Sequence, residues 1–125
     1  IGDSSQPTLE DNEVRGCKYD GIYVFGQAAP TIHANQFVDN ASKRSDTANL
    51  NFDEDSAGTV SDNKILSASK RPGILVTGNG HPLIQGNEIK KNRYGILLEG
   101  RSFPTLKDNF FEGNEEEQVD RRKKK

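Results

Sequence analysis

The sequence contains no methionine, no tryptophan and only one cysteine, Cys17. A single cysteine excludes a disulfide within the chain, and chains without disulfides are typical of a reducing compartment. No stretch approaches the roughly 20 apolar residues that a membrane-spanning helix needs, and no signal peptide is visible. We therefore expect a protein of the cytoplasm or the nucleus that does not bind membranes. Because the chain begins at Ile1 and lacks methionine, we also expect it to be a piece of a longer protein.

The sequence also lacks an excess of charge of either sign and has few apolar residues. Its 17 basic and 19 acidic residues give a formal net charge of −2, which provides no global attraction to nucleic acid. Nucleic acid is therefore not an expected partner. Apolar residues make up 31% of the chain and charged residues 29%, a balance typical of disorder unless the apolar residues are regularly spaced. Here their spacing is regular.

Five copies of one pattern run through the chain. An asparagine has Leu, Ile or Val three residues before it, Val, Ile or Phe two residues after it, and Pro or Gly five residues before it. The five asparagines are Asn12, Asn35, Asn63, Asn87 and Asn109. Successive asparagines are 23, 28, 24 and 22 residues apart, and the longest copy carries an insertion at 42–47. Each complete copy ends in a segment of alternating apolar residues, at 21–26, 49–54, 73–78 and 95–100.

A repeat of this length indicates a solenoid, and two kinds compete. A leucine-rich repeat shares the Leu-x-x-Asn-x-Val element, but it has leucine where this chain has Pro or Gly. No part of the repeat has helical spacing, and the alternating segments rich in Ile and Val predict short strands. Two or three short strands per copy, joined by Gly and Pro corners, make one coil of a parallel β-helix. Equivalent residues then lie about 4.8 Å apart in neighbouring coils.

This stacking assigns a role to each column of equivalent residues. The apolar columns, which begin with Leu9, Val14, Ile22 and Val24 in the first copy, are predicted to point inward and form the core. Asparagine suits a corner because it tolerates left-handed backbone, and its amide can bond to the amides above and below. We therefore interpret the five repeated asparagines as a structural ladder rather than as ligand-binding residues.

The motif Pro-x-[Ile/Leu]-x-x-Asn-x-[Ile/Val/Phe], followed by Gly-Ile-x-[Val/Leu]-x-Gly, resembles the right-handed parallel β-helix repeat of the pectate-lyase-like superfamily. It is most similar to the β-helix domains of F-box ubiquitin-ligase subunits and Shc-SH2-binding proteins, and the resemblance covers residues 2–114. It implies an all-β, right-handed parallel β-helix solenoid of about four and a half coils of 22–28 residues, which start near 7, 30, 58, 82 and 104. That superfamily includes polysaccharide lyases, hydrolases, epimerases and non-catalytic binders, so the resemblance selects no activity.

Candidate catalytic groups are sparse on the outward side of the alternating segments. Asp53 and Glu99 share an outward column, but they lie two coils apart, near 10 Å, with Thr77 between them. A glycosidase needs two carboxylates roughly 5–9 Å apart. His33 and His81 have no second histidine or cysteine at the spacing of metal ligands. We therefore assign no catalytic, metal-binding or cofactor-binding residue. We expect that the protein is not an enzyme, although the sequence does not decide this question.

The outward columns are unusually apolar for a solvent-facing strand. We expect an exposed sheet face there that binds a partner through Tyr23, Phe25, Leu75 and Leu97. Substitutions in this outward column should leave the stability of the fold nearly unchanged. The predicted function is a non-catalytic protein-interaction or scaffold module whose partner is another protein. The alternative is a carbohydrate-binding or carbohydrate-active β-helix, in which Tyr23 and Phe25 stack on sugar and the two acids supply the chemistry. A purely structural spacer is a third possibility.

Three local features lie beside this pattern. Cys17 aligns with Asn40, Ala68, Asn92 and Asn114 in a column of small corner residues, so we expect a packed, structural thiol. Asn40-Ala41-Ser42 is a glycosylation sequon that matters only in a secreted protein. We expect the repeats to occupy residues 1–114 and residues 115–125 to form a charged, disordered tail. The alternative for residues 121–125 is a nuclear-localisation or anion-binding patch.

Overall fold

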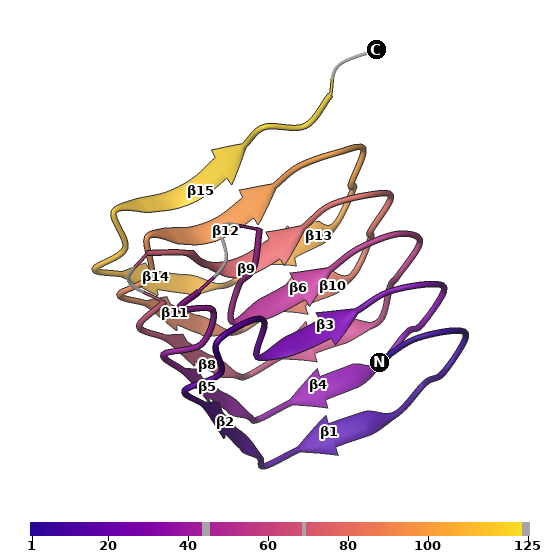
Figure 1. Ribbon diagram of the computed structural model, residues 1–125, viewed down its shortest axis with the longest axis horizontal. Coiled ribbons are helices and arrows are strands. Elements are labelled where there is room, and N and C mark those ends of the chain that lie inside the picture. The colour runs from indigo at the N-terminus through magenta and orange to yellow at the C-terminus, as the bar shows by residue number, and fades with distance from the viewer. Residues whose placement is uncertain (44–45, 69, 124–125) are drawn as a thin grey trace.

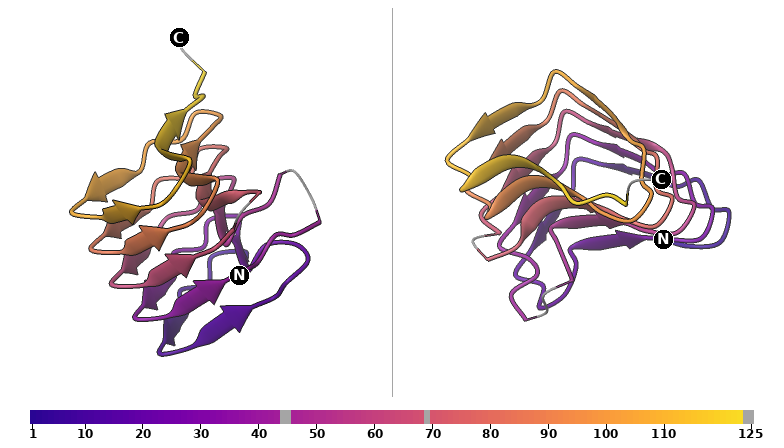
Figure 2. Two further views of the ribbon diagram at one scale, coloured as in Figure 1. Left: turned by 90° about the vertical axis from the view of Figure 1, so that its left-hand side faces the viewer. Right: turned by 90° about the horizontal axis from the view of Figure 1, so that it is seen from above.

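The computed structural model describes residues 1–43, 46–68 and 70–123, which form fifteen short strands and no helix. Hence they contain no helix that is long and apolar enough to cross a membrane. The chain coils so that every third strand returns to the same side of the molecule (Figure 1). Viewed from above, successive coils lie over one another (Figure 2). The predicted all-β parallel solenoid is confirmed.

Each coil contributes one strand to each of three parallel sheets. Sheet A contains β1 (Thr8–Glu10), β4 (Thr31–His33), β7 (Thr59–Ser61), β10 (Leu83–Gln85) and β13 (Thr105–Lys107). Sheet B contains β2 (Glu13–Arg15), β5 (Gln36–Val38), β8 (Lys64–Leu66), β11 (Glu88–Lys90) and β14 (Phe110–Glu112). Sheet C contains β3 (Ile22–Val24), β6 (Leu50–Phe52), β9 (Pro72–Val76), β12 (Tyr94–Leu98) and β15 (Glu116–Asp120). We number the coils 1 to 5 from the N-terminus.

The register of the sheets places the predicted inward columns in the core. Leu9 pairs with Ile32, and Val14 pairs with Phe37, in the parallel ladders of sheets A and B. The inward residues of the middle coils are buried, whereas several of those in the terminal coils, such as Val14 and Phe111, are only partly buried. Terminal coils have a neighbour on one side only, so the core residues are most completely buried in the middle of the solenoid.

The strand β15 completes coil 5, so the solenoid has five coils rather than four and a half. Residues 116–120, which we expected within a disordered tail, form this strand and pair with β12. Its inward positions carry Gln118 and Asp120, and its outward Val119 pairs with Leu97. The alternation is therefore inverted relative to the other coils, which is why the sequence pattern did not reveal it. Lys124 and Lys125 lie outside the described residues.

The asparagine ladder lies at the corner between sheets A and B, where it bonds adjacent coils. Asn63 is typical: its Nδ2 donates to the Ile32 carbonyl oxygen at 2.9 Å and to Asn87 Oδ1 at 3.0 Å. Its backbone N–H donates to the same Asn87 oxygen, and its own Oδ1 accepts two bonds from Asn35. The residue before each asparagine, rather than the asparagine as we expected, takes the left-handed conformation: Asp11, Ala34, Asp62, Gly86 and Asp108.

A second ladder lies at the corner between sheets B and C. Asn40, Asn92 and Asn114 occupy it in coils 2, 4 and 5, but coil 3 has Ala68 there. Asn49 fills the gap, since its Oδ1 accepts from Asn40 Nδ2 at 2.9 Å and its Nδ2 donates to Asn92 Oδ1 at 3.2 Å. The column that we interpreted only as small corner residues is thus a hydrogen-bonded ladder with one substituted rung.

Candidate functional site

The outward side of sheet C carries the residues that the sequence pattern indicated for partner binding. Tyr23, Leu75 and Leu97 stand in one column of paired residues, with Asn51 between the first two and Val119 at its end. Tyr23 is 37% exposed. The Phe25 ring stacks on that of Tyr23 with centroids 5.2 Å apart. The common column is therefore confirmed, and its role in binding stays a prediction.

The expected exposure of this column is wrong for two of its members. Leu75 is only 3% exposed and Leu97 only 6%. They pack with Ala48, Tyr94 and Val119 in an outer cluster that is separate from the main core. Ala48 directly follows the insertion at 42–47, and Val119 belongs to β15, so the residues that pack on these leucines include two that lie outside the repeat pattern.

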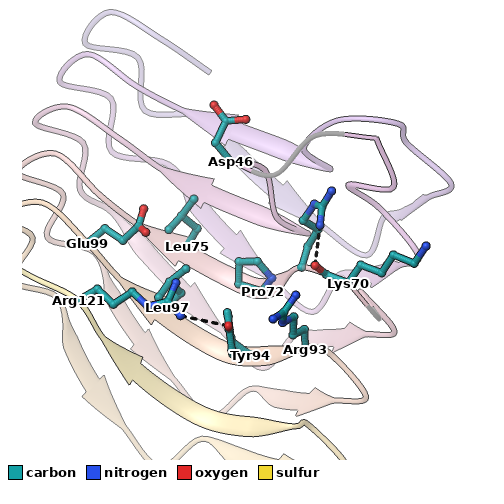
Figure 3. Close-up of a pocket in the computed structure, with 10 residues that line it drawn as sticks. Asp46, Lys70, Pro72, Leu75, Arg93, Tyr94, Leu97, Glu99 and Arg121 are labelled. Atoms are coloured by element: carbon teal, nitrogen blue, oxygen red, sulfur yellow. Dashed lines mark hydrogen bonds between the residues drawn. The ribbon is translucent and has the colours of Figure 1, made fainter.

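Two adjoining hollows flank the outer cluster. The acidic hollow has a volume of about 530 Å³, and its lining includes Tyr19, Asp20, Tyr23, Asp46, Asp53, Thr77 and Glu99. The basic hollow has a volume of about 470 Å³, and its lining includes Lys70, Arg71, Arg93, Tyr94, Leu97 and Arg121 (Figure 3). Both hollows are also lined by Leu75, Asp46 and Glu99, so they meet over the middle of sheet C.

In the acidic hollow, a tyrosine and a carboxylate are joined across neighbouring coils. The Tyr23 hydroxyl donates to Asp53 Oδ2 at 2.8 Å, and Asp53 Oδ1 accepts the backbone N–H of Glu54 at 2.7 Å. Burial, followed by the bond to Asp53 and the charges of Asp53, Glu54 and Asp20, raises the pKa of Tyr23 to about 12. Tyr23 is therefore neutral at physiological pH, and the charge of this hollow comes from its carboxylates.

In the basic hollow, two guanidinium groups are ordered around one tyrosine ring. The Cζ atoms of Arg93 and Arg121 each lie 5.2 Å from the centroid of Tyr94. The Arg121 Nη2 donates to the Tyr94 hydroxyl at 3.1 Å, and Figure 3 shows the two arginines flanking the ring. These residues were missed in the sequence, although Arg71 and Arg93 both stand two residues before the glycine that opens an alternating segment.

The two acids considered for catalysis both line the acidic hollow but stand in separate coils. The backbone N–H of Thr77 donates to Phe52, and that of Glu99 donates to Val76, which places Thr77 between Asp53 and Glu99 in the stack. Their coils are thus about 10 Å apart. Within the described part of the chain, no group of three or more His, Cys, Asp or Glu residues could hold a metal ion. His33, in sheet A, bonds Ser61 Oγ at 2.9 Å.

The sequon asparagine and the cysteine both belong to the second ladder. Asn40 is 2% exposed, and its Nδ2 is bonded to the Val14 carbonyl oxygen and to Asn49. A glycan on this nitrogen would replace bonds that hold the coils together. The half-buried Cys17 donates its backbone N–H to Asn40 Oδ1 at 2.9 Å, so it stands at the end of this ladder.

Comparison with known proteins places this architecture in a family. A family model described as the right-handed β-helix region matches residues 1–120. No curated protein and no solved structure matches the chain, so the specific similarity to F-box subunits or Shc-SH2-binding proteins is unsupported. The match spans nearly the whole solenoid, and the chain belongs to the right-handed β-helix family.

Proposed function

We propose that this β-helix is a non-catalytic interaction platform that binds a protein partner on the outward side of sheet C. The observation that carries the proposal is the pair of adjoining hollows of opposite charge over one sheet. Aromatic side chains stand in both, and Tyr19 is 57% exposed. Tyrosine and arginine are the residues that most often dominate binding energy at protein interfaces, and both kinds are present here.

The solenoid presents these groups on a rigid support. Each strand of sheet C is paired to its neighbours, and the two asparagine ladders fix the corners. A preorganised site loses little conformational entropy when a partner binds. The arrangement therefore suits recognition of a partner along several coils at once.

The carboxylates support binding more than catalysis. Asp53 is engaged by the Tyr23 hydroxyl and by a backbone N–H, and Thr77 separates its coil from that of Glu99. A glycosidase needs its two carboxylates roughly 5–9 Å apart, facing one bond of the substrate. We accordingly propose a role for Asp53 and Glu99 as charges that a partner recognises.

Carbohydrate binding is the second candidate, favoured by one observation. The exposed rings of Tyr19 and Tyr23 stand beside the carboxylates of Asp20 and Asp53 in the acidic hollow. Aromatic faces stack on sugar rings, and carboxylates accept bonds from sugar hydroxyls. A location in the cytoplasm or nucleus, which rests on the lone Cys17, would disfavour this candidate and is itself a proposal.

A substitution that blocks the outward side of sheet C distinguishes protein binding from carbohydrate binding. Thr77→Arg places a long cation in the acidic hollow, and Thr31→Arg makes the same change on the exposed side of sheet A. Both variants and the wild type are panned against a displayed random-peptide library and tested on a glycan array. We expect peptides that bind the wild type and Thr31→Arg but not Thr77→Arg. Glycans with this pattern would favour the second candidate, and equal binding by both variants would contradict a site on sheet C.

A further inference from the structure

We propose that the partner segment is an extended peptide with separated charges, whose acidic residues enter the basic hollow while its basic residues lie over the acidic hollow. This inference rests on the proposed function and deepens it by naming the chemistry that the face selects. It follows from the order of the guanidinium groups, the sign of each hollow and the length over which they extend.

The basic hollow is prepared for carboxylates. Its cations come from three successive coils: Lys70 and Arg71 precede β9, Arg93 precedes β12, and Arg121 follows β15. The contacts of Arg93 and Arg121 with Tyr94 restrict both guanidinium planes before any ligand arrives. A guanidinium group bonds a carboxylate through two parallel N–H donors, and little entropy is lost when its orientation is already set.

The ion pair of Arg93 with Glu115 does not prevent this binding. The Arg93 Nε lies 3.8 Å from Glu115 Oε2, but the two side chains are 49% and 71% exposed. Exposed pairs of this kind are screened by water and contribute little. A carboxylate from a partner can therefore replace Glu115 beside Arg93 at small cost.

The acidic hollow sets the opposite requirement. Carboxylates of Asp20, Asp53 and Glu99 line it, whereas no lysine or arginine among the described residues does. The Asp20 Oδ1 accepts bonds from the Ala48 N–H and Asn51 Nδ2, which fixes the acid at the rim. Uniformly anionic ligands such as nucleic acid would be repelled here, so a peptide carrying both signs fits the whole face better.

The length of the face defines the size of the segment. Tyr23 belongs to coil 1 and Arg121 follows the strand of coil 5, so the two hollows extend over about four coil spacings, or roughly 19 Å. An extended peptide rises about 3.3 Å per residue, so roughly six residues cover this distance. The residues shared by both hollows are Leu75, Asp46 and Glu99, so the middle of the segment needs small or apolar side chains over Leu75 and no acidic residue.

Four fluorescent ten-residue peptides and one DNA test the inference. Two peptides carry a block of three Glu and a block of three Lys around a Gly-Ser-Ala-Gly spacer, in the two possible orders. The third contains the same residues with Glu and Lys alternating, and the fourth replaces both with Gln. Fluorescence anisotropy should show one block order binding at least about tenfold more tightly than the alternating peptide, with affinity falling as salt rises. Equal affinity for block and alternating peptides, or tighter binding of a ten-nucleotide single-stranded DNA, would overturn the inference.

A charge reversal locates the acidic block. The double variant Arg93→Glu/Arg121→Glu should bind the preferred block peptide at least about tenfold more weakly and should gain affinity for a peptide with Lys in both blocks. The control Lys64→Glu/Lys107→Glu makes the same change of charge on sheets B and A, and it should bind like the wild type. Circular dichroism verifies that both variants are folded. Unchanged binding by Arg93→Glu/Arg121→Glu would overturn the inference.

Different results would overturn the binding platform on sheet C and the charge pattern assigned to its partner. Display-selected peptides that lose binding to Thr77→Arg but bind Arg93→Glu/Arg121→Glu normally would overturn the charge assignment and leave the platform on sheet C in place. Peptides that bind Thr77→Arg and the wild type equally would remove both.

Discussion

The side-chain amide of Asn49 donates to Asn92 Oδ1 at 3.2 Å across a coil in which the second ladder has Ala68. Two departures from the repeat, Ala68 in the second ladder and Asn49 in a column that otherwise has mostly glycine, thus compensate each other. Coils 1, 3 and 4 have glycine in the column of Asn49, and at Gly21 and Gly73 an added Cβ atom would come within 2.9 Å of a ladder amide nitrogen. Asn49 occupies this column in the coil next to the one that lacks the rung.

This relationship predicts a rescue. Asn49→Gly should cost roughly 1–3 kcal/mol of unfolding free energy, because Asn40 Nδ2 and its backbone N–H lose their acceptor in a buried corner. Adding Ala68→Asn to Asn49→Gly restores the arrangement of the other coils and should recover most of the loss. Urea denaturation of the two variants measures the difference. A double variant no more stable than Asn49→Gly would refute the compensation.

The first ladder should be most sensitive at its centre. Asn63→Ala or Asn87→Ala leaves buried donors and acceptors without partners and should cost roughly 1–3 kcal/mol in chemical denaturation. Asn12→Ala should cost less, because Asn12 is exposed in a terminal coil. Equal losses at central and terminal positions would argue against cooperative bonding along the ladder.

Burial of the outer cluster changes what substitutions on sheet C should do. Leu75→Ala should cost about 2–4 kcal/mol as a buried leucine, in contrast to the sequence-based expectation of a nearly neutral change. Tyr19→Ala, at the exposed rim of the acidic hollow, should stay within about 0.5 kcal/mol. Thermal unfolding of both variants provides the comparison, and a neutral Leu75→Ala would mean that the outer cluster is not packed.

The raised pKa of Tyr23 predicts a loss of stability at alkaline pH. A tyrosine with a pKa of about 12 in the folded chain, against 10.0 ordinarily, holds its proton longer when folded. Its contribution is therefore fully present below pH 10 and is lost as pH rises from 10 through 12. Unfolding free energies of the wild type should fall over this range, and Tyr23→Phe should fall less. Parallel curves for the two proteins would contradict the assignment.

The same tyrosine tests its link to Asp53. Asp53→Asn removes the charged acceptor and should lower the pKa of Tyr23, but only part of the way, because burial is the largest cause of the shift. Absorbance titration of tyrosinate, with Tyr19→Phe/Tyr94→Phe as the background, isolates this one group. A pKa unchanged by Asp53→Asn would show that the bond at 2.8 Å does not persist in solution.

The sequence by itself determined the coil. Alternating apolar residues specify which side chains of a strand point inward, and a repeated asparagine brings equivalent residues of successive coils into register. These are local properties with a fixed period, so the inward columns at Ile32, Phe37 and Ile74 could be predicted, and the structure buries all three completely. The left-handed corner conformation was assigned one residue too late, because in four of the five copies the residue before the asparagine is Asp or Gly, which also adopts this conformation readily.

Only the tertiary structure decided what covers sheet C. The insertion at 42–47, Ala48 and the inverted strand β15 do not follow the repeat, so their periodicity carries no information about where they pack. Ala48 and Val119 pack with the buried Leu75 and Leu97, Asn49 bonds into the second ladder, and Arg93 and Arg121 lie beside the Tyr94 ring. Contacts between segments of different period depend on three-dimensional shape and charge. The outward column of sheet C could therefore be predicted from the sequence, but its burial and the two charged hollows beside it could be read only from the folded chain.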